Sequence, residues 1–129
     1  MIRELQTTSR VFIAVINWWN AVDPKLFYEF PGDHAGELET SVMLEISPDL
    51  MLPISEAGSG HARKFAIAGL KDGLAWTPRK WTQVTDDTGS GDPSAGTKEK
   101  GARHLEAVTS KIGEFLVDLA AADTSRLYE

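Results

Sequence analysis

One histidine and two glutamates lie close together in the segment 34–41, which reads HAGELETS. If a helix starts here, residues three positions apart share a face, so His34 and Glu37 are expected to converge on one point. Glu39, two positions further on, points to a different side. The two small residues between His34 and Glu37 leave room for a metal or a substrate to approach the backbone. A histidine in this place could move a proton, and a carboxylate could hold a metal ion.

The same residues also fit an ordinary helix start. Asp33 belongs to a residue type that commonly caps helices, and the helix dipole alone favours Glu37 and Glu39 in a first turn. The remaining histidines are His61 and His104, and His104 is expected on the surface of a long helix. Spacing alone therefore leaves both the structural and the catalytic interpretation open.

Composition narrows the classes of chemistry that the chain can carry. The 129 residues include no cysteine, which excludes disulfides, iron–sulfur clusters and a cysteine nucleophile. Any metal site must use His, Asp and Glu, which suit Zn, Mn or Mg. A net charge of -6 and a pI of about 5.0 argue against nucleic-acid or anionic-membrane partners. No apolar run is long enough for a membrane span and no signal peptide is recognisable, so the cytoplasm is the expected compartment.

The elements that must position these residues alternate between strand and helix. The run VFIAVI at residues 11–16 is apolar on both faces, which predicts a buried, parallel-type strand. In residues 76–84, Trp and Thr alternate with basic residues around Pro78, which predicts an edge strand or an extended arm. Helices are expected over residues 1–6, 25–30, 35–46 and 95–122. This order favours an α/β layer architecture.

A polar, glycine-rich loop over residues 85–97, TDDTGSGDPSAGT, is a second candidate site. It lacks the lysine and the spacing of a phosphate-binding P-loop, so that function has little support. Asp86, Asp87 and Asp92 could bind a cation, although a solvated polar loop is the simpler interpretation.

Two motifs in this chain resemble those of the creatininase family of amidohydrolases. The first is His34–Leu44, HAGELETSVML. The second is the run Asp87–Pro93, followed by Ala95 and Glu99–Gly101, which is similar to the loop with which these proteins enter their last helix. The stretches Glu56-Ala-Gly and Ala75-Trp-Thr-Pro-Arg also fit the family. The resemblance spans nearly the whole chain, and two ordered, separate motifs argue against chance agreement.

The resemblance implies a fold, an assembly and a chemistry. The fold is a three-layer α/β/α sandwich of which residues 1–129 would form the C-terminal part of a single domain. Family members assemble as homohexamers and use two divalent metals, Zn or Mn, to activate a water. That water opens the C–N bond of a cyclic or linear amide.

The resemblance also implies roles for single residues. His34 matches the proton donor to the leaving nitrogen, and Glu37 matches a glutamate that ligates a metal in many members. We expect Glu39 to orient its neighbours by hydrogen bonds, and we count Asp33 among the residues that surround the substrate.

Aromatic residues of this chain match sequence positions that surround the substrate in family members. Creatininase proper has tryptophans that close over the substrate ring, and Trp18 or Trp19 matches one of these places. An aromatic pair at a strand end is, however, more often part of a core or an interface. Phe30 stands at the second place and Pro31 replaces the Asp that follows it. These two departures count against creatinine itself as the substrate.

The family's remaining metal ligands do not occur in this sequence. They are a Glu-x-His pair, a bridging Asp and an Asn-Gly-His-Gly-Gly-Asn loop, all in the N-terminal half of family members. The leading hypothesis is a metal-dependent amidohydrolase that acts on a small-molecule amide and forms a homo-oligomer. The alternative is a truncated, non-catalytic chain, or one half of a split enzyme, with a structural role in assembly. In either case, we expect the isolated chain to aggregate or to pair with itself.

Overall fold

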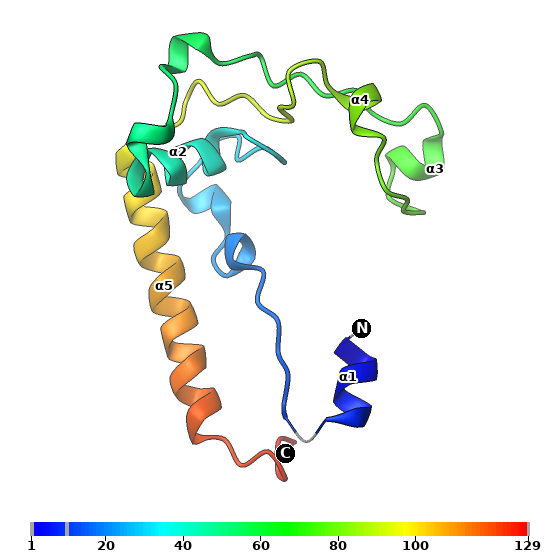
Figure 1. Ribbon diagram of the computed structural model, residues 1–129, viewed down its shortest axis with the longest axis vertical. Coiled ribbons are helices and arrows are strands. Elements are labelled where there is room, and N and C mark those ends of the chain that lie inside the picture. The colour runs from blue at the N-terminus through cyan, green and yellow to red at the C-terminus, as the bar shows by residue number, and fades with distance from the viewer. Residues whose placement is uncertain (1, 10, 129) are drawn as a thin grey trace. The chain divides into compact units, whose positions relative to one another are not determined.

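The computed structural model describes residues 2–9 and 11–128. Helices separated by long irregular segments make up this part of the chain (Figure 1). The α-helices are α1 (Ile2–Thr8), α2 (Glu37–Ile46), α3 (Ala68–Lys71), α4 (Trp81–Val84) and α5 (Lys98–Ala121). The 3₁₀ helices are η1 (Trp18–Asn20), η2 (Pro24–Leu26), η3 (Pro48–Leu50) and η4 (Ile54–Glu56).

The chain divides into two compact units, which are described separately. Residues 24–105 form one unit, which contains the HAGELETS segment. Residues 1–23 and 106–129 form the other. Among the helices of the described residues, none combines the length and the apolar character that a membrane crossing requires.

Helix α2 packs against the first turns of α5 in the unit of residues 24–105. A Cβ atom added to Gly101 of α5 would lie 2.0 Å from the carbonyl oxygen of Ser41, so the two backbones approach as closely as a glycine allows. Leu38 and Val42 of α2 are buried, as the helical pattern predicts, whereas Ile46 is 57% exposed. The apolar stripe of α2 is therefore buried over its first two positions only.

Two segments leave α2 and α5 side by side and carry the two shortest α-helices at their far end. The outgoing segment, residues 51–67, and the returning one, residues 85–94, run next to each other (Figure 1). The N–H of Arg63 donates to the carbonyl of Val84 at 2.7 Å, and the N–H of Gly91 donates to that of Gly60 at 2.9 Å. The edge strand predicted over residues 76–84 is not formed, because residues 76–80 have no regular secondary structure and residues 81–84 form α4 (Trp81–Val84).

The predicted three-layer α/β/α sandwich is wrong for this chain. Within residues 2–9 and 11–128 there is no sheet, and β-type pairing is limited to one antiparallel bridge between His34 and Ser90. Residue 11 is a bend, residues 12–16 belong to no strand, and the segment follows a drawn-out course (Figure 1). Val11 and Val15 are 66% and 65% exposed. A buried parallel strand needs neighbouring strands that accept and donate its backbone hydrogen bonds. The apolar pattern measures the tendency to form a strand and not the presence of those neighbours.

The helix predictions were closer to the structure. The expected helices at residues 35–46 and 95–122 correspond to α2 and α5. Helix α2 begins two residues later than predicted and ends at the predicted residue, and α5 begins three residues later and ends one residue earlier. The helix expected at the N-terminus corresponds to α1, with Met1 outside the described residues. The helix expected over residues 25–30 is reduced to the single turn η2.

Candidate active site

The two motifs of the sequence meet at His34. The N–H of His34 donates to the carbonyl of Ser90 at 3.0 Å, and the N–H of Ser90 donates back to the carbonyl of His34 at 2.8 Å. The N–H of Asp33 donates to the same Ser90 oxygen at 2.8 Å. Gly91 has φ +145, and a Cβ atom there would lie 2.7 Å from the Cα of Gly32, so only glycine fits this contact. The loop of residues 85–97 thus holds the turn that carries His34.

The imidazole of His34 is oriented by its neighbours and remains open to solvent. Its side chain is 50% exposed, and its Nδ1 lies 3.6 Å from Oε2 of Glu39. The ring of Trp81 meets it edge to face, with the centroids 5.4 Å apart. The N–H of Ala35 donates to Oε2 of Glu39 at 2.6 Å and fixes that carboxylate. A positioned and accessible imidazole is what proton transfer to a bound molecule requires.

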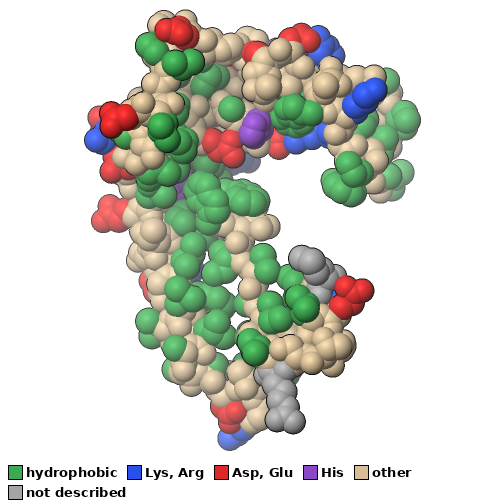
Figure 2. Space-filling model, viewed as in Figure 1, with side chains coloured by type: hydrophobic (Ala, Val, Ile, Leu, Met, Phe, Trp, Pro, Cys, Tyr) green, Lys and Arg blue, Asp and Glu red, His purple; other side chains and the backbone are tan. Residues whose placement is uncertain are grey.

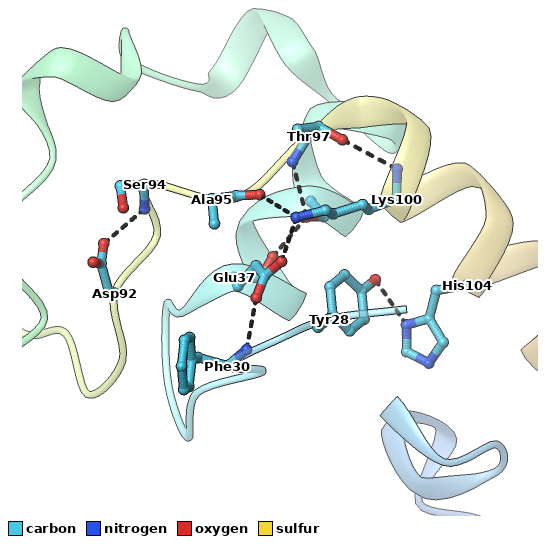
Figure 3. A network of polar contacts seen from close by, with 10 residues as sticks. Tyr28, Phe30, Glu37, Asp92, Ser94, Ala95, Thr97, Lys100 and His104 are labelled. Carbon is cyan, nitrogen blue, oxygen red and sulfur yellow. Dashed lines mark hydrogen bonds and ion pairs between the residues drawn. The ribbon is translucent and has the colours of Figure 1, made fainter. Parts of the chain in front are cut away.

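Glu37 points away from His34 and into the protein. It is fully buried, and its Oε1 accepts a hydrogen bond of 2.6 Å from the ammonium of Lys100 (Figure 3). Its Oε2 accepts the N–H of Phe30 at 2.9 Å, and Lys100 also donates to the carbonyl of Ala95 at 2.8 Å. Burial by itself would raise the pKa of Glu37, but the hydrogen bonds from Lys100 and Phe30 outweigh it and hold the pKa below its ordinary value. Glu37 is therefore an ionised partner of Lys100.

This arrangement does not fit a metal site. A metal site needs several donor groups that converge on the ion, and a cation beside the site opposes metal binding. Each carboxylate oxygen of Glu37 already accepts a hydrogen bond from the protein, and one of these donors is a cation. The described residues contain no group of three or more His, Asp or Glu side chains placed to hold a metal ion together.

The second buried polar pair lies one helical turn beyond Lys100. His104, which was predicted to lie on the surface, is fully buried, and its Nδ1 is 3.0 Å from the hydroxyl oxygen of Tyr28 (Figure 3). Burial lowers the pKa of His104. Burial, with the nearby charge of Glu37, raises the pKa of Tyr28 to about 12. The sequence predicts on which face of a helix a residue lies, but it does not predict which other segment covers that face.

Comparison with known proteins identifies a family to which this sequence is similar. The sequence model of the family described as "Creatininase: Creatinine amidohydrolase" matches residues 1–116. The chain belongs to the creatininase family. A crystal structure from Bacteroides fragilis, of a protein named provisionally as a creatinine amidohydrolase, is 41% identical and superimposes with a TM-score of 0.88. That alignment covers 99% of this chain and 50% of the other, so this chain spans about half the length of that protein. No curated protein matches this chain.

The predicted site residues of this creatininase-family chain do not all lie beside His34. Asp33 stands beside His34, and its Oδ2 accepts hydrogen bonds from Arg79 and, at 3.2 Å, from the hydroxyl of Ser90. The side chain of Phe30 is exposed, although its N–H is bound to Glu37. The structure thus brings His34 together with Glu39 and Asp33, and places Glu37 elsewhere.

The two predicted tryptophans belong to the other unit of this creatininase-family chain. Trp18 and Trp19 lie in η1, with their rings edge to face and 6.1 Å apart. Trp19 is exposed. Their assignment to the surroundings of the substrate stays a prediction.

The three aspartates of the loop of residues 85–97 make hydrogen bonds and ion pairs with nearby residues. Asp87 accepts hydrogen bonds from the hydroxyl of Thr85 at 2.8 Å and from the N–H of Gly89 at 3.1 Å. Asp86 pairs with Arg63, and Asp92 accepts the N–H of Ser94 at 2.8 Å. This use of the aspartates agrees with the simpler interpretation of a solvated polar loop.

Sequence reasoning did not select Trp81, Arg79 or Lys100 as members of the site. Arg79 and Lys100 lie in stretches that resemble the family, and this resemblance does not indicate which residues they bind. Their partners lie 46 and 63 positions away along the chain. Spacing within one element cannot predict contacts of that separation.

Proposed function

We propose that this chain supplies the proton-donor side of the active site of an amidohydrolase, with His34 as the catalytic residue. The observation that carries the proposal is the imidazole of His34, which is half exposed and held between Glu39 and Trp81. Membership of the creatininase family supports the reaction class, hydrolysis of a C–N bond.

The chemistry assigned to this chain is protonation of the leaving nitrogen. Glu39 lies on the Nδ1 side of the ring, which leaves Nε2 of His34 for the substrate. As water adds to the amide carbon and the C–N bond breaks, the proton on Nε2 passes to the departing nitrogen. Trp81 restricts the ring, so that the donor is in place before the bond breaks.

Family members are generally metal-dependent, and Zn or Mn is the metal that the resemblance implies. Donors other than Glu37 would have to hold such an ion, because that carboxylate is committed to Lys100 and Phe30. The steps proposed for this chain are therefore limited to orientation and proton transfer.

The proposal is tested by replacing His34 and comparing hydrolysis of a panel of cyclic and linear amides. His34→Asn should lower kcat by about a hundredfold or more, because general acid catalysis typically contributes 10²–10⁴-fold. His61→Asn is the matched control, since His61 is exposed and lies in an irregular segment. It should leave the rate unchanged.

The rates of the variants decide between donor and structural roles. An unchanged rate in His34→Asn would overturn the proposal. An equal loss in both variants would show that the effect is not specific to His34 and would overturn it as well.

A non-catalytic role in assembly is the second candidate. The observation in its favour is that Glu37, the one matched ligand position, is held by Lys100. Metal analysis of the purified chain, combined with the same amide panel, separates the two candidates. Bound metal or hydrolysis would favour the enzyme, and the absence of both would favour the assembly role.

A further inference from the structure

Basic side chains gather around one cavity in a chain that is acidic as a whole. The cavity measures about 620 Å³, and its lining includes Arg63, Lys64, Lys71, Arg79, Lys80 and the single carboxylate Asp33. Five of the chain's 13 Lys and Arg residues therefore line one cavity, although the net charge is -6. Figure 2 shows several Lys and Arg side chains over the segment that carries α3 and α4. We call this cavity the basic cleft.

The positive charge of the basic cleft is only partly balanced. Arg63 pairs with Asp86 at 2.5 Å, and Arg79 pairs with Asp33. Lys64, Lys71 and Lys80 form no ion pair with any carboxylate of the described residues. A cavity lined by one sign of charge concentrates its field and attracts ligands of the opposite sign.

The basic cleft adjoins the candidate active site. Asp33 and Ser90 line it, and each is joined to the turn of His34. The guanidinium of Arg79 lies 4.7 Å from the ring centroid of Trp81, and that ring contacts His34. One continuous set of contacts therefore links the positive cavity to the proton donor.

We propose that the basic cleft binds an anionic group, a phosphate or a carboxylate, on the substrate whose C–N bond is presented to His34. This inference rests on the proposed function and adds the substrate class. Lys64, Lys71 and Lys80 supply the charge, while Phe65 and Leu70 line the same cavity and offer apolar contact to the body of the substrate. A neutral ring compound would make no use of the charge gathered here.

The first test measures binding without catalysis. Inorganic phosphate and, separately, acetate are titrated calorimetrically into the whole chain at constant ionic strength. The triple variant Lys64→Gln, Lys71→Gln, Lys80→Gln should weaken binding of at least one anion by about tenfold, because each charge contributes to attraction in a partly enclosed site. A preference for phosphate or acetate identifies which of the two anions the cleft recognises.

A charge-matched control separates a site from general attraction. The variant Lys98→Gln, Lys111→Gln, Arg126→Gln removes the same charge from exposed residues outside the cleft lining. It should change anion affinity by less than twofold. An equal effect of both triple variants, or no measurable binding of either anion, would overturn the proposal. Loss of self-association in the cleft variant alone would instead assign the lysines to contact with a second copy, and would also overturn it.

A second test relates the cleft to hydrolysis and keeps the two proposals apart. Cleavage is compared for N-acetylglycine, N-acetyl-O-phosphoethanolamine and the neutral N-acetylglycinamide. The cleft variant should lower kcat/KM for at least one anionic amide by about tenfold and leave the neutral one unchanged. Anion binding without any hydrolysis would refute the proposed function and leave the cleft standing. Hydrolysis that does not depend on substrate charge would refute the cleft and leave the function standing.

Discussion

Glu37 connects three separate parts of the chain through one buried carboxylate. It starts α2, accepts the N–H of Phe30 and pairs with Lys100 in the first turn of α5. A buried charge is tolerated only when its partners replace the hydrogen bonds that water would provide. The residue that matches a metal ligand of the family by its position in the motif is thus bound to Phe30 and Lys100 in this structure.

Replacing Glu37 with Gln should lower the free energy of unfolding by about 2 kcal/mol, because it removes a charge-assisted hydrogen bond from Lys100, whose side chain is 28% exposed. Urea denaturation measures this loss. The double variant Glu37→Leu, Lys100→Met should lose less than Glu37→Gln, because neither charge is then left alone. Unchanged stability with a lower affinity for Zn or Mn would contradict this account and restore Glu37 as a ligand.

Tyr28 and His104 should make the stability of the protein depend on pH in two separate ranges. The folded protein keeps the Tyr28 proton up to about pH 12, whereas the unfolded chain loses it near 10.0, so stability should fall as the pH rises above 10.0. Burial lowers the pKa of His104 from 6.5, so the unfolded chain takes up this proton first and stability should fall as the pH drops below 6.5.

Denaturation at a series of pH values measures the loss of stability in both the acidic and the alkaline range. Tyr28→Phe should reduce the alkaline loss of stability, which is roughly 3 kcal/mol for a shift of this size. Tyr128→Phe is the control, because that side chain is 93% exposed. The same alkaline curve in both variants would contradict the assignment to Tyr28.

At the scale of elements, the close approach of α2 and α5 positions the site. Helix α2 begins three residues after His34, and the hydroxyl of Ser41 in α2 accepts the N–H of Thr97 at 3.0 Å, just before α5. Gly101 allows the contact, because its missing side chain leaves room for the backbone of Ser41. The contact between these helices therefore fixes the end of the loop of residues 85–97 relative to the turn that carries His34.

Gly101→Ala should therefore destabilise the protein although alanine favours helices. The steric overlap with Ser41 should cost about 2 kcal/mol and exceed the gain of about 1 kcal/mol in helix propensity. Gly113, in the same helix, has no atom within 4 Å of an added Cβ among the described residues. Gly113→Ala should raise the melting temperature, and a rise in Gly101→Ala as well would contradict the close packing.

At the scale of the whole molecule, apolar side chains remain exposed in both units. In the segment 11–16, Val11, Val15 and Ile16 are exposed on an extended backbone without partner strands among the described residues. Exposed apolar side chains on a segment that belongs to no sheet promote association with another chain. We therefore propose that the chain self-associates through this segment.

Sedimentation measurements over a range of concentrations test this association. Val11→Lys with Val15→Lys should shift the protein towards the monomer, because two charges oppose apolar contact and edge pairing. Thr82→Lys with Ser110→Lys adds the same charge at exposed polar positions and should have no effect. A monomer at all concentrations in the unchanged chain would contradict the prediction.

The family and the long helices could be predicted from the sequence, because both depend on local information. The HAGELETS run and the glycine-rich loop are contiguous motifs, and the two long helices follow from apolar residues repeated every three to four positions. The prediction of a strand at residues 11–16 used the same kind of information. It described the backbone as extended but could not supply the neighbouring strands that a sheet requires.

Only the tertiary structure decided which partners the site residues have. Lys100 is 63 positions from Glu37, Ser90 pairs with His34 across 56 positions, and His104 is buried against Tyr28 across 76. A side chain's neighbours along the chain determine its helix and its face, whereas its pKa, burial and ligands depend on whichever distant segment packs there. For this reason the sequence identified His34 as a candidate donor, and the structure showed that Glu37 is paired with a lysine.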